Sequence, residues 1–335
     1  MVFYPQKAFY AILLIVITDD LYYSFIQMKI LVFGSGAVGG YYGARLTKGG
    51  NDLYFVARGK QLEAMQTGGL HIESIQGNME IQANASERFD TIDQLDLILV
   101  CVKVGDTPSI IPQVREQAGK DTTVISLQNG VDGVTMLKEA VPCENIIDGI
   151  AFIGSNLYEY GKIRHTAAGS ITIGELNGEK SERAERIRKI FDDAGIECRV
   201  TSKIHSAKWE KLIWNAGFNG LAAITDVPVG KLLSFEPTRK IVIGLMQEVI
   251  AIARKMDIEI NPGSIERHLA VSEKMDNVIP SMLQDVRGGK KTEIDFINGK
   301  IVREGERLGI PVPYNESIWA SVSMLDTKRE RSGRR

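Results

Sequence analysis

Short apolar runs alternate with helical patterns over the first 200 residues of the chain. The runs Lys29–Phe33, Asp52–Ala57, Leu95–Val102 and Thr122–Leu127 each have the length of a strand. Leu95–Val102 is almost continuously apolar, which is typical of a parallel strand that is covered on both faces. After the first run, apolar residues recur at helical spacing through Leu46. This alternation of strands and helices predicts an open α/β sheet.

The middle of the chain contains further segments with the composition of strands. Gly69–Gln82 holds two short alternating runs on either side of Gly77-Asn78, a pattern that indicates a hairpin. The other elements predicted in this half are strands over Asn145–Phe152, Lys162–Ile173 and Cys198–Thr201 and an amphipathic helix over Glu182–Ala194.

The periodicity becomes helical from about Ser202 onward, with proline and glycine at the joins between segments. We therefore expect a domain boundary near residue 201, with an α/β domain over residues 28–201 and an all-α domain over residues 202–325. Residues 326–335 include the run TKRERSGRR, which is typical of a solvated and disordered basic tail.

Residues 1–27 differ in character from the rest of the chain. The apolar run Ala8–Ile17 is too short to span a bilayer, and Asp19-Asp20 follows it directly. A secretory signal is not indicated, because the start carries only Lys7 and no A-x-A pattern. We interpret the segment as a peripheral extension or a mis-assigned start before Met28, and a weak membrane anchor is the alternative.

A glycine-rich motif joins the first predicted strand to the helix that follows it. The motif G-x-G-x-x-G, in the strand–loop–helix context of a dinucleotide-binding site, consists of Gly34, Ser35, Gly36, Ala37, Val38 and Gly39. Gly34 would permit the tight turn, Gly36 would let the backbone approach a pyrophosphate, and Gly39 would allow close packing of helix on strand. The pyrophosphate would lie at the helix N-terminus. The alternative is a glycine-rich loop without a ligand.

The residue after the second strand indicates which dinucleotide is bound. An acidic residue there binds the ribose 2′-hydroxyl of NAD, whereas an arginine suits the 2′-phosphate of NADP. Arg58 and Lys60 place two cations at this position, so we expect NADP(H) rather than NAD(H); the alternative for Arg58 is a surface arginine in a turn. The expected fold class is α/β, with an N-terminal Rossmann-type doubly wound sheet followed by an all-α C-terminal domain.

Two polar residues follow predicted strands at the sheet edge where open α/β sheets bind ligands. Lys103 comes directly after Leu95–Val102, and Asn129 lies in the loop after Thr122–Leu127. Asn129 precedes a glycine and is therefore either a turn residue or a cofactor contact.

Composition narrows the class of protein. A chain of 335 residues is long enough for about two domains, and 44% hydrophobic with 24% charged residues is ordinary for a globular protein. A net charge of −2 gives no reason to expect nucleic acid or a membrane as partner. Three cysteines and four scattered histidines lack metal-ligand spacing, so we expect no metal and a cytoplasmic location.

Three polar residues share one face of a predicted helix in the second half. Lys211, Asn215 and Asn219 fall at positions i, i+4 and i+8. Asparagine is a poor residue for a helix interior, and a buried amide must be hydrogen-bonded. The two asparagines therefore either join helices together or line a polar pocket with Lys211 at one end.

Glu293 is predicted to lie in a helix whose apolar face includes Ile294, Phe296 and Ile297. Its carboxylate is either an ordinary surface charge or, if it faces Lys211, a group that orients the ammonium and tunes its pKa.

These motifs together resemble the ketopantoate reductase family, the 2-dehydropantoate 2-reductases of pantothenate biosynthesis. The resemblance extends from Met28 to about Ser323. It rests on the glycine motif, Leu99–Lys103, Gln128-Asn129-Gly130, Trp209–Asn219 and Ser281–Asn298. Two features depart from the family pattern: a further substrate asparagine has no counterpart in Asp226–Gly230, and Ile153–Ser155, expected near the nicotinamide, matches only loosely.

The resemblance implies a role for each matching residue. Lys211 would be the general acid that protonates the ketone oxygen as hydride arrives from NADPH, and Glu293 would be a second catalytic residue on the nicotinamide side. The residues implied in substrate binding are Lys211, Asn215, Asn219 and Ser281. Those implied in cofactor binding are Gly34, Ser35, Gly36, Ala37, Val38, Gly39, Arg58, Lys103, Asn129 and Glu293.

The implied function is the NADPH-dependent reduction of 2-dehydropantoate to pantoate. One alternative is reduction of another 2- or 3-oxo acid, because folds of this type accept many substrates. An alternative of another class is a non-catalytic NADPH-binding sensor, which would not need Lys211 and Glu293 together. As partners we expect a small 2-oxo acid, with no nucleic acid and no stable membrane association; assembly into a homodimer is left open.

Overall fold

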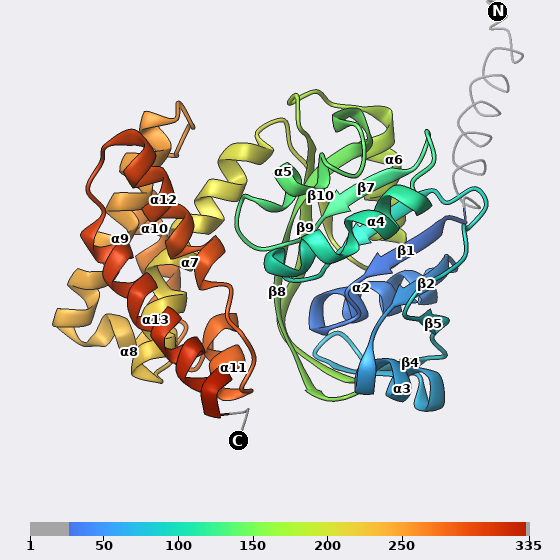
Figure 1. The fold of residues 1–335 in the computed structure, drawn as a ribbon, viewed down its shortest axis with the longest axis horizontal. Coiled ribbons are helices and arrows are strands. Elements are labelled where there is room, and N and C mark those ends of the chain that lie inside the picture. The colour runs from blue at the N-terminus through green and yellow to red at the C-terminus, as the bar shows by residue number, and fades with distance from the viewer. Residues whose placement is uncertain (1–26, 333–335) are drawn as a thin grey trace, which may run out of the picture.

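A mixed β-sheet organises the first part of the chain. The computed structural model describes residues 27–332, so all but the last residue of the predicted N-terminal extension, residues 1–27, lies outside the described residues. Within them, ten strands form one sheet in the order β4-β3-β9-β8-β7-β6-β1-β2-β5, and β10 pairs with β9. Helices cover the sheet, and a separate group of helices lies beside it (Figure 1).

The central strands are parallel, as their apolar runs predict. They are β1 (Lys29–Phe33), β2 (Asp52–Val56), β6 (Leu97–Val100) and β7 (Thr123–Ser126), with the two-residue β5 (Ala85–Ser86) outside β2. Because β1 lies between β2 and β6, the strand order reverses beside it, which is where open α/β sheets bind ligands.

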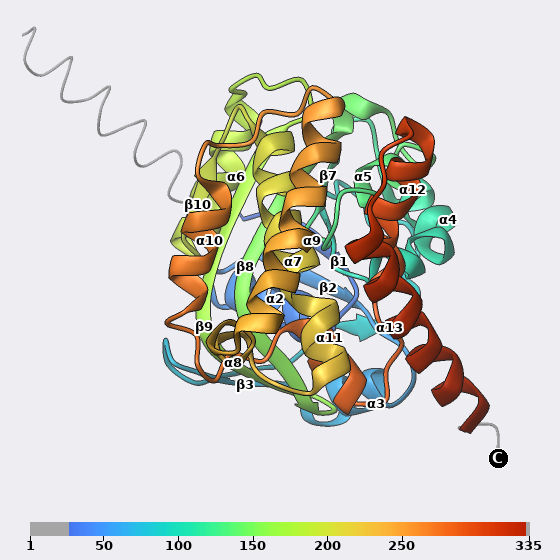
Figure 2. The same ribbon diagram turned by 90° about the vertical axis from the view of Figure 1, so that its left-hand side faces the viewer.

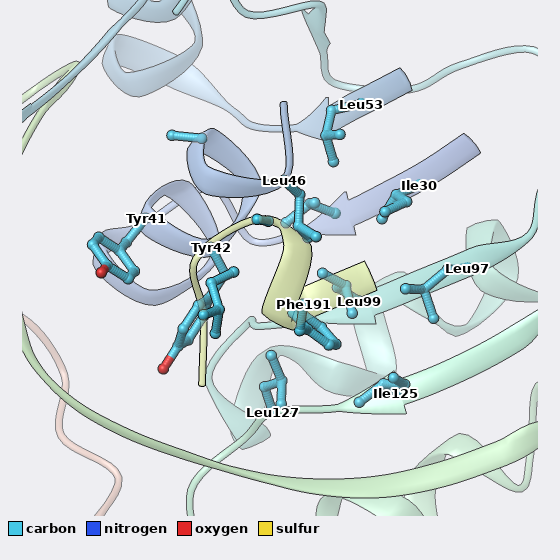
Figure 3. Packing of buried hydrophobic residues seen from close by; sticks show 14 of the residues in the cluster. Ile30, Tyr41, Tyr42, Leu46, Leu53, Leu97, Leu99, Ile125, Leu127 and Phe191 are labelled. Atoms are coloured by element: carbon cyan, nitrogen blue, oxygen red, sulfur yellow. The ribbon is translucent and has the colours of Figure 1, made fainter. Parts of the chain in front are cut away.

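Both faces of these strands are buried under helices. Alternate residues of β1 point to opposite faces: Ile30 and Val32 belong to one apolar cluster, and Leu31 and Phe33 belong to another. The first cluster includes residues of α2 (Ala37–Lys48), α3 (Gly59–Gly68) and α6 (Glu182–Asp193). The second includes residues of α4 (Thr107–Gln117) and α5 (Gly133–Leu137). Figure 3 shows side chains of α2 and α6 facing those of β1, β6 and β7.

A long antiparallel hairpin forms the side of the sheet next to the helical group. Its strands, β8 (Ile146–Glu159) and β9 (Lys162–Glu175), are longer than the sequence pattern predicts, and bulges interrupt their pairing, one of them between Phe152 and Ile153. The hairpin predicted over Gly69–Gln82 is confirmed as β3 (Leu70–Ser74) and β4 (Met79–Ile81). The last strand, β10 (Cys198–Val200), runs parallel to β9.

All elements after β10 in the described chain are helical, which confirms the predicted fold class. In chain order they are α7 (Ile204–Thr225), α8 (Val229–Ser234), α9 (Glu236–Lys255), α10 (Ser264–Ser272), α11 (Ser281–Arg287), the 3₁₀ turn η3 (Ile294–Phe296), α12 (Asn298–Leu308) and α13 (Pro313–Ser332). The sheet part also has two 3₁₀ turns, η1 (Val104–Asp106) and η2 (Cys143–Asn145). Helices α7 to α13 share a third apolar core, and Figure 2 shows them in front of the sheet.

The prediction of a disordered basic run is wrong for residues 327–332, the part of TKRERSGRR that the structure describes. Helix α13 continues through Ser332, and Asp326 is buried, where its carboxylate accepts hydrogen bonds from the backbone N–H and hydroxyl of Thr292. Arg329 donates to the carbonyl of Val286. Arg329 therefore attaches the described part of the basic run to the end of α11, a contact that the composition of the run could not reveal.

Among the helices that the structure describes, none has the length and hydropathy needed to cross a bilayer.

Candidate active site

The three glycines of the motif have different surroundings. Gly34 has φ +95°, and a Cβ built on it would lie 2.6 Å from the backbone nitrogen of Val102. A Cβ on Gly39 would lie 2.2 Å from the carbonyl oxygen of Gly34, so only glycine allows this approach of helix to loop. A Cβ on Gly36 would meet nothing within 4 Å. The space beside Gly36 is thus open to a ligand, as the motif requires.

The N-terminus of α2 suits an anion. No side chain caps it, and its first turn, from Ala37 through Val38 to Gly39, contains no acidic residue. Its backbone N–H groups are therefore free of side-chain partners, and its positive dipole end faces the loop. Ser35 donates from its hydroxyl to the carbonyl of Val56, and this bond fixes the loop to β2. These features fit the pyrophosphate of a dinucleotide.

Arg58 stands where the sequence places a cofactor-selecting residue. It lies two residues after the end of β2 and directly before α3. Its side chain is 76% exposed, and one guanidinium nitrogen lies 3.6 Å from the Asp106 carboxylate. Gln61 of α3 also contacts the glycine motif, because its side-chain amide donates to the carbonyl of Ser35. Gln61 has no sequence signature that marks it, because an isolated glutamine in an amphipathic helix is ordinary.

Lys211 joins the two parts of the molecule. From α7 its ammonium donates to the side-chain oxygen of Asn129 (3.0 Å) and to the carbonyl of Ala151 in β8 (2.8 Å). Asn129 lies in the loop after β7, at the predicted sheet edge. An ammonium has three N–H donors, and these two bonds fix its direction.

Glu293 approaches the same group from the helical part. One carboxylate oxygen accepts from the side-chain amide of Asn129 (3.1 Å), and the other accepts from the backbone N–H of Val104 (3.1 Å). Glu293 is only 9% exposed, so the surface-charge alternative does not hold. It faces Lys211 through Asn129, which bridges the carboxylate and the ammonium.

The prediction that Glu293 lies in a helix is wrong. It precedes η3 in an irregular segment, and α12 begins only at Asn298, after Ile297 leaves helical geometry with φ −112° and ψ −90°. The apolar periodicity of Ile294 to Ile301 is real but belongs to a 3₁₀ turn and the first turn of α12. Thr292, bound to Asp326, holds the segment in this shape.

The surroundings lower the pKa of Lys211 to about 8. Burial is the largest cause, because it disfavours the charged form, and the nearby positive charge of Lys208 acts in the same direction. The negative charge of Glu293 opposes both. The ammonium is therefore a stronger acid than an ordinary lysine and can release a proton near neutral pH.

The two asparagines of α7 are buried without full hydrogen bonding. Asn215 is 4% exposed and Asn219 is 1% exposed. The amide nitrogen of Asn215 and both side-chain polar atoms of Asn219 have no partner among the described residues. Such orphaned groups are costly unless a ligand satisfies them. This favours the polar-pocket alternative over the one in which the asparagines join helices.

The amide that does join helices is Asn298, which the sequence pattern did not single out. Its side chain donates to the carbonyl of Ala216 in α7 and to the side-chain oxygen of Asn315 in α13. A lone asparagine within a predicted helix gives no signal of this role.

Two other predicted site residues are arranged differently. Lys103 reaches across to the helical part, where its ammonium pairs with Asp285 of α11 (2.8 Å) and donates to the carbonyl of Lys291 (2.5 Å). Ser281 begins α11, and its side chain is exposed. The structure thus brings Lys211, Asn129 and Glu293 together, while a role for Ser281 in the site stays a prediction.

Comparison with known proteins covers both parts of the chain. The family model described as ketopantoate reductase PanE/ApbA matches residues 30–178, and the model of the C-terminal part of that family matches residues 203–326. A 2-dehydropantoate 2-reductase of Archaeoglobus fulgidus is 32% identical over 87% of this chain and 95% of its own length.

Solved structures agree with this family. A 2-dehydropantoate 2-reductase from Geobacter metallireducens is 34% identical, covers 89% of this chain and 99% of its own, and superposes with a TM-score of 0.84. A D-mandelate dehydrogenase solved with NADH and anilino(oxo)acetate is 25% identical, covers 90% of this chain and 100% of its own, and also gives a TM-score of 0.84. The chain belongs to the ketopantoate reductase (PanE/ApbA) family of pyridine-nucleotide-dependent oxidoreductases that act on CH–OH groups.

Proposed function

We propose that this enzyme reduces 2-dehydropantoate to pantoate with NADPH. The observation that carries the proposal is the directed ammonium of Lys211 on the same helix face as the unpaired amide nitrogen of Asn215 and the unpaired amide of Asn219. 2-Dehydropantoate offers a ketone oxygen to the ammonium, and its carboxylate and its hydroxyl to the amides. Residues 28–201 would bind the cofactor, and residues 202–325 would bind the substrate.

The chemistry requires a proton donor at the ketone oxygen. Bound NADPH supplies the hydride, which forms a bond to the ketone carbon while the C=O π electrons move to oxygen. Lys211 transfers a proton from its ammonium to that oxygen, so the product is an alcohol and the lysine is left neutral until it takes a proton from water. A pKa of about 8 suits this donor, because it is protonated at neutral pH yet acidic enough to transfer the proton.

Asn129 and Glu293 hold the donor in place. Asn129 accepts from Lys211 and donates to Glu293, so its amide orientation is fixed by both neighbours. The carboxylate also partly offsets the depression of the Lys211 pKa, which keeps the ammonium protonated at neutral pH. The ammonium of Lys211 has a third N–H, which donates to neither Asn129 nor Ala151. This N–H stabilises the negative charge that develops on the substrate oxygen.

Replacing Lys211 tests the catalytic proposal. We expect Lys211→Ala to lower kcat by about two to four orders of magnitude, because general acid catalysis contributes that much, while NADPH binding persists. The steady-state rate of NADPH oxidation, followed by absorbance, gives kcat, and nucleotide fluorescence gives the affinity for NADPH. Lys231→Ala is the matched control, since Lys231 is an exposed lysine of α8. A Lys211→Ala enzyme as fast as the parent contradicts the proposal.

A substrate panel distinguishes the alternatives. Selective turnover of 2-dehydropantoate supports the proposal, and NADPH binding without turnover of any acid supports the sensor. A specific observation favours one other substrate class: Phe152 is 52% exposed, with its ring centroid 5.8 Å from the Lys211 ammonium, and a similar fold serves D-mandelate dehydrogenase. Phenylglyoxylate, the 2-oxo acid that corresponds to mandelate, therefore belongs in the panel.

The preference for NADPH rests on Arg58. An exposed guanidinium at the end of β2 can bind a 2′-phosphate in bidentate fashion. We expect Arg58→Ala to weaken NADPH binding at least about tenfold, the equivalent of 1.4 kcal/mol, with little change for NADH. Arg115→Ala, on α4, is the control. Equal losses for both nucleotides, or a parent that prefers NADH, would count against NADP as the cofactor.

A further inference from the structure

A second lysine lies one helical turn before Lys211. Lys208 also belongs to α7, but its side chain is only 5% exposed. Its ammonium pairs with Asp148 of β8 at 3.0 Å, and the Asp148 side chain is likewise 5% exposed. A lysine buried to this extent is rare unless its charge is paired.

Every donor of this ammonium has an acceptor. Besides Asp148, the Lys208 ammonium donates to the backbone carbonyls of Gln128 (3.1 Å) and Gly149 (3.2 Å). Asp148 in turn accepts from the backbone N–H of Gly149 (2.9 Å). The ammonium is therefore saturated and has no donor left for a substrate.

These acceptors are adjacent in sequence to the partners of Lys211. Gln128 precedes Asn129, whose side chain accepts from Lys211, and Gly149 lies two residues before Ala151, whose carbonyl accepts from Lys211. Lys208 thus binds the same two backbone segments as Lys211, one step deeper in the molecule. Any movement of α7 against the sheet would break both sets of bonds.

We propose that Lys208, together with Asp148, is a positioning residue for the reaction, holding the segments of Asn129 and Ala151 at hydrogen-bonding distance from Lys211. This inference rests on the proposed role of Lys211 as proton donor. Catalytic geometry is sensitive at this scale, since a displacement of about 1 Å can cost about two orders of magnitude in rate.

The charge of Lys208 has a second effect on the same group. It is the second cause, after burial, of the depressed pKa of Lys211. The other charged groups around Lys211 are Glu293, which opposes this effect from the segment before η3, and the Lys103–Asp285 pair beyond it. Removing Lys208 would therefore make Lys211 a weaker acid.

A purely structural ion pair is the competing explanation. A buried pair is often replaceable by neutral groups without loss of stability, because the cost of desolvation offsets the attraction. The test therefore needs a neutral replacement that leaves no unpaired charge. The double variant Lys208→Met/Asp148→Asn meets this need, since asparagine keeps an oxygen that can accept from the N–H of Gly149.

We expect the double variant to lose at least about tenfold in kcat and to keep the parent's affinity for NADPH. The basic limb of the kcat–pH profile should move to higher pH by at least about half a pH unit in the single variant Lys208→Met, as Coulomb's law gives for the loss of a charge about 6 Å away even in water. It should move less in the double variant, which also removes the negative charge of Asp148. Lys203→Met is the matched control, because Lys203 also forms an ion pair at the start of α7, with Glu259, but at an exposed position. It should behave as the parent does.

A double variant with the parent's kcat overturns the proposal and leaves a structural pair. If that variant does not fold, Lys208→Arg decides the matter, since it retains the charge and changes the geometry. The proposal then requires a kcat at least about tenfold lower with an unmoved basic limb, and a parent-like kcat overturns it.

One measurement separates this proposal from the proposed function. Reductive methylation with ¹³C-formaldehyde labels lysines, and NMR titration of the Lys211 signal, assigned by its loss in Lys211→Ala, reports its pKa without any substrate. A rise of that pKa in Lys208→Met, which keeps Asp148, supports the effect of Lys208 even if 2-dehydropantoate is not the substrate. An unchanged pKa contradicts that effect even if the parent reduces 2-dehydropantoate.

Discussion

Lys211 combines two properties at the scale of one residue: a lowered pKa and a fixed direction. The hydrogen bonds from its ammonium go to an amide oxygen and a backbone carbonyl, both neutral. A carboxylate in direct contact would have raised the pKa. Placing Glu293 one group further away keeps its orienting effect while leaving burial as the dominant influence on acidity.

This arrangement predicts the pH dependence of the reaction. The protonated lysine is the active form, so kcat should be level at low pH and fall as the pH rises through about 8, the pKa of Lys211. An ordinary lysine would give that fall above pH 10. A kcat–pH profile measured with saturating NADPH and substrate checks this. A basic limb near the ordinary lysine value would show that the lowered pKa does not operate in the reaction.

The residue-scale features could be predicted only in part from the sequence. The i, i+4, i+8 spacing correctly placed Lys211 and the two asparagines on one face, because helix geometry is local. The contact of Lys211 with Asn129, far apart in the chain, depends on how β7, β8 and α7 come together. No local pattern contains that information.

Among the elements, the segment that leads from β1 into α2 contains two glycines of one motif that have different structural roles. Gly39 is packed against the carbonyl of Gly34, whereas the space at Gly36 is open. Replacement by alanine should therefore destabilise the fold at Gly39 but weaken nucleotide binding at Gly36.

We expect Gly39→Ala to destabilise the fold by about 1–3 kcal/mol, because the added methyl overlaps the backbone. Gly36→Ala should leave the free energy of unfolding nearly unchanged and weaken NADPH binding at least about tenfold, since its methyl occupies the space left for the pyrophosphate. Urea unfolding and nucleotide titration measure the two effects. If Gly36→Ala binds NADPH as the parent does, the loop does not hold the pyrophosphate as inferred.

Element predictions succeeded where a local period decides the structure. The buried parallel strands were readable as apolar runs because helices cover both faces. The lengths of β8 and β9 could not be predicted, since their outer halves leave the core and carry exposed residues such as Tyr158 of β8. Glu293 was placed in a helix because the apolar spacing around it fits one, although the anchor at Thr292 prevents that helix from forming.

On the scale of the whole molecule, separate apolar cores meet across a polar junction. The sheet part and the helical part have their own clusters of buried residues. Between them lie hydrogen bonds and ion pairs, such as those of Asp132 with Lys300 (2.9 Å) and Arg303 (3.2 Å). A junction of this kind leaves polar groups available to a bound ligand.

Asp326 near the end of α13 supports the segment of Glu293 at this junction. Deleting residues 326–335 would remove the acceptor for both donors of Thr292, next to Glu293. An unpaired buried donor costs about 1–3 kcal/mol, so we expect a lower melting temperature and a reduced kcat. A chain that ends at Ser332 is the control and should match the parent. Equal behaviour of the two truncations would show that Asp326 supports nothing.

The hydrogen bonds of Lys211 have a stereochemical consequence. The carbonyl of Ala151 and the oxygen of Asn129 leave the ammonium one direction in which to meet a ketone. In the proposed reaction, a cofactor bound at the glycine loop would deliver hydride from the other part of the molecule. A planar ketone held between two such fixed points presents a single face to hydride. The alcohol should therefore form as one enantiomer, with its handedness determined by the way the two halves of the protein are joined.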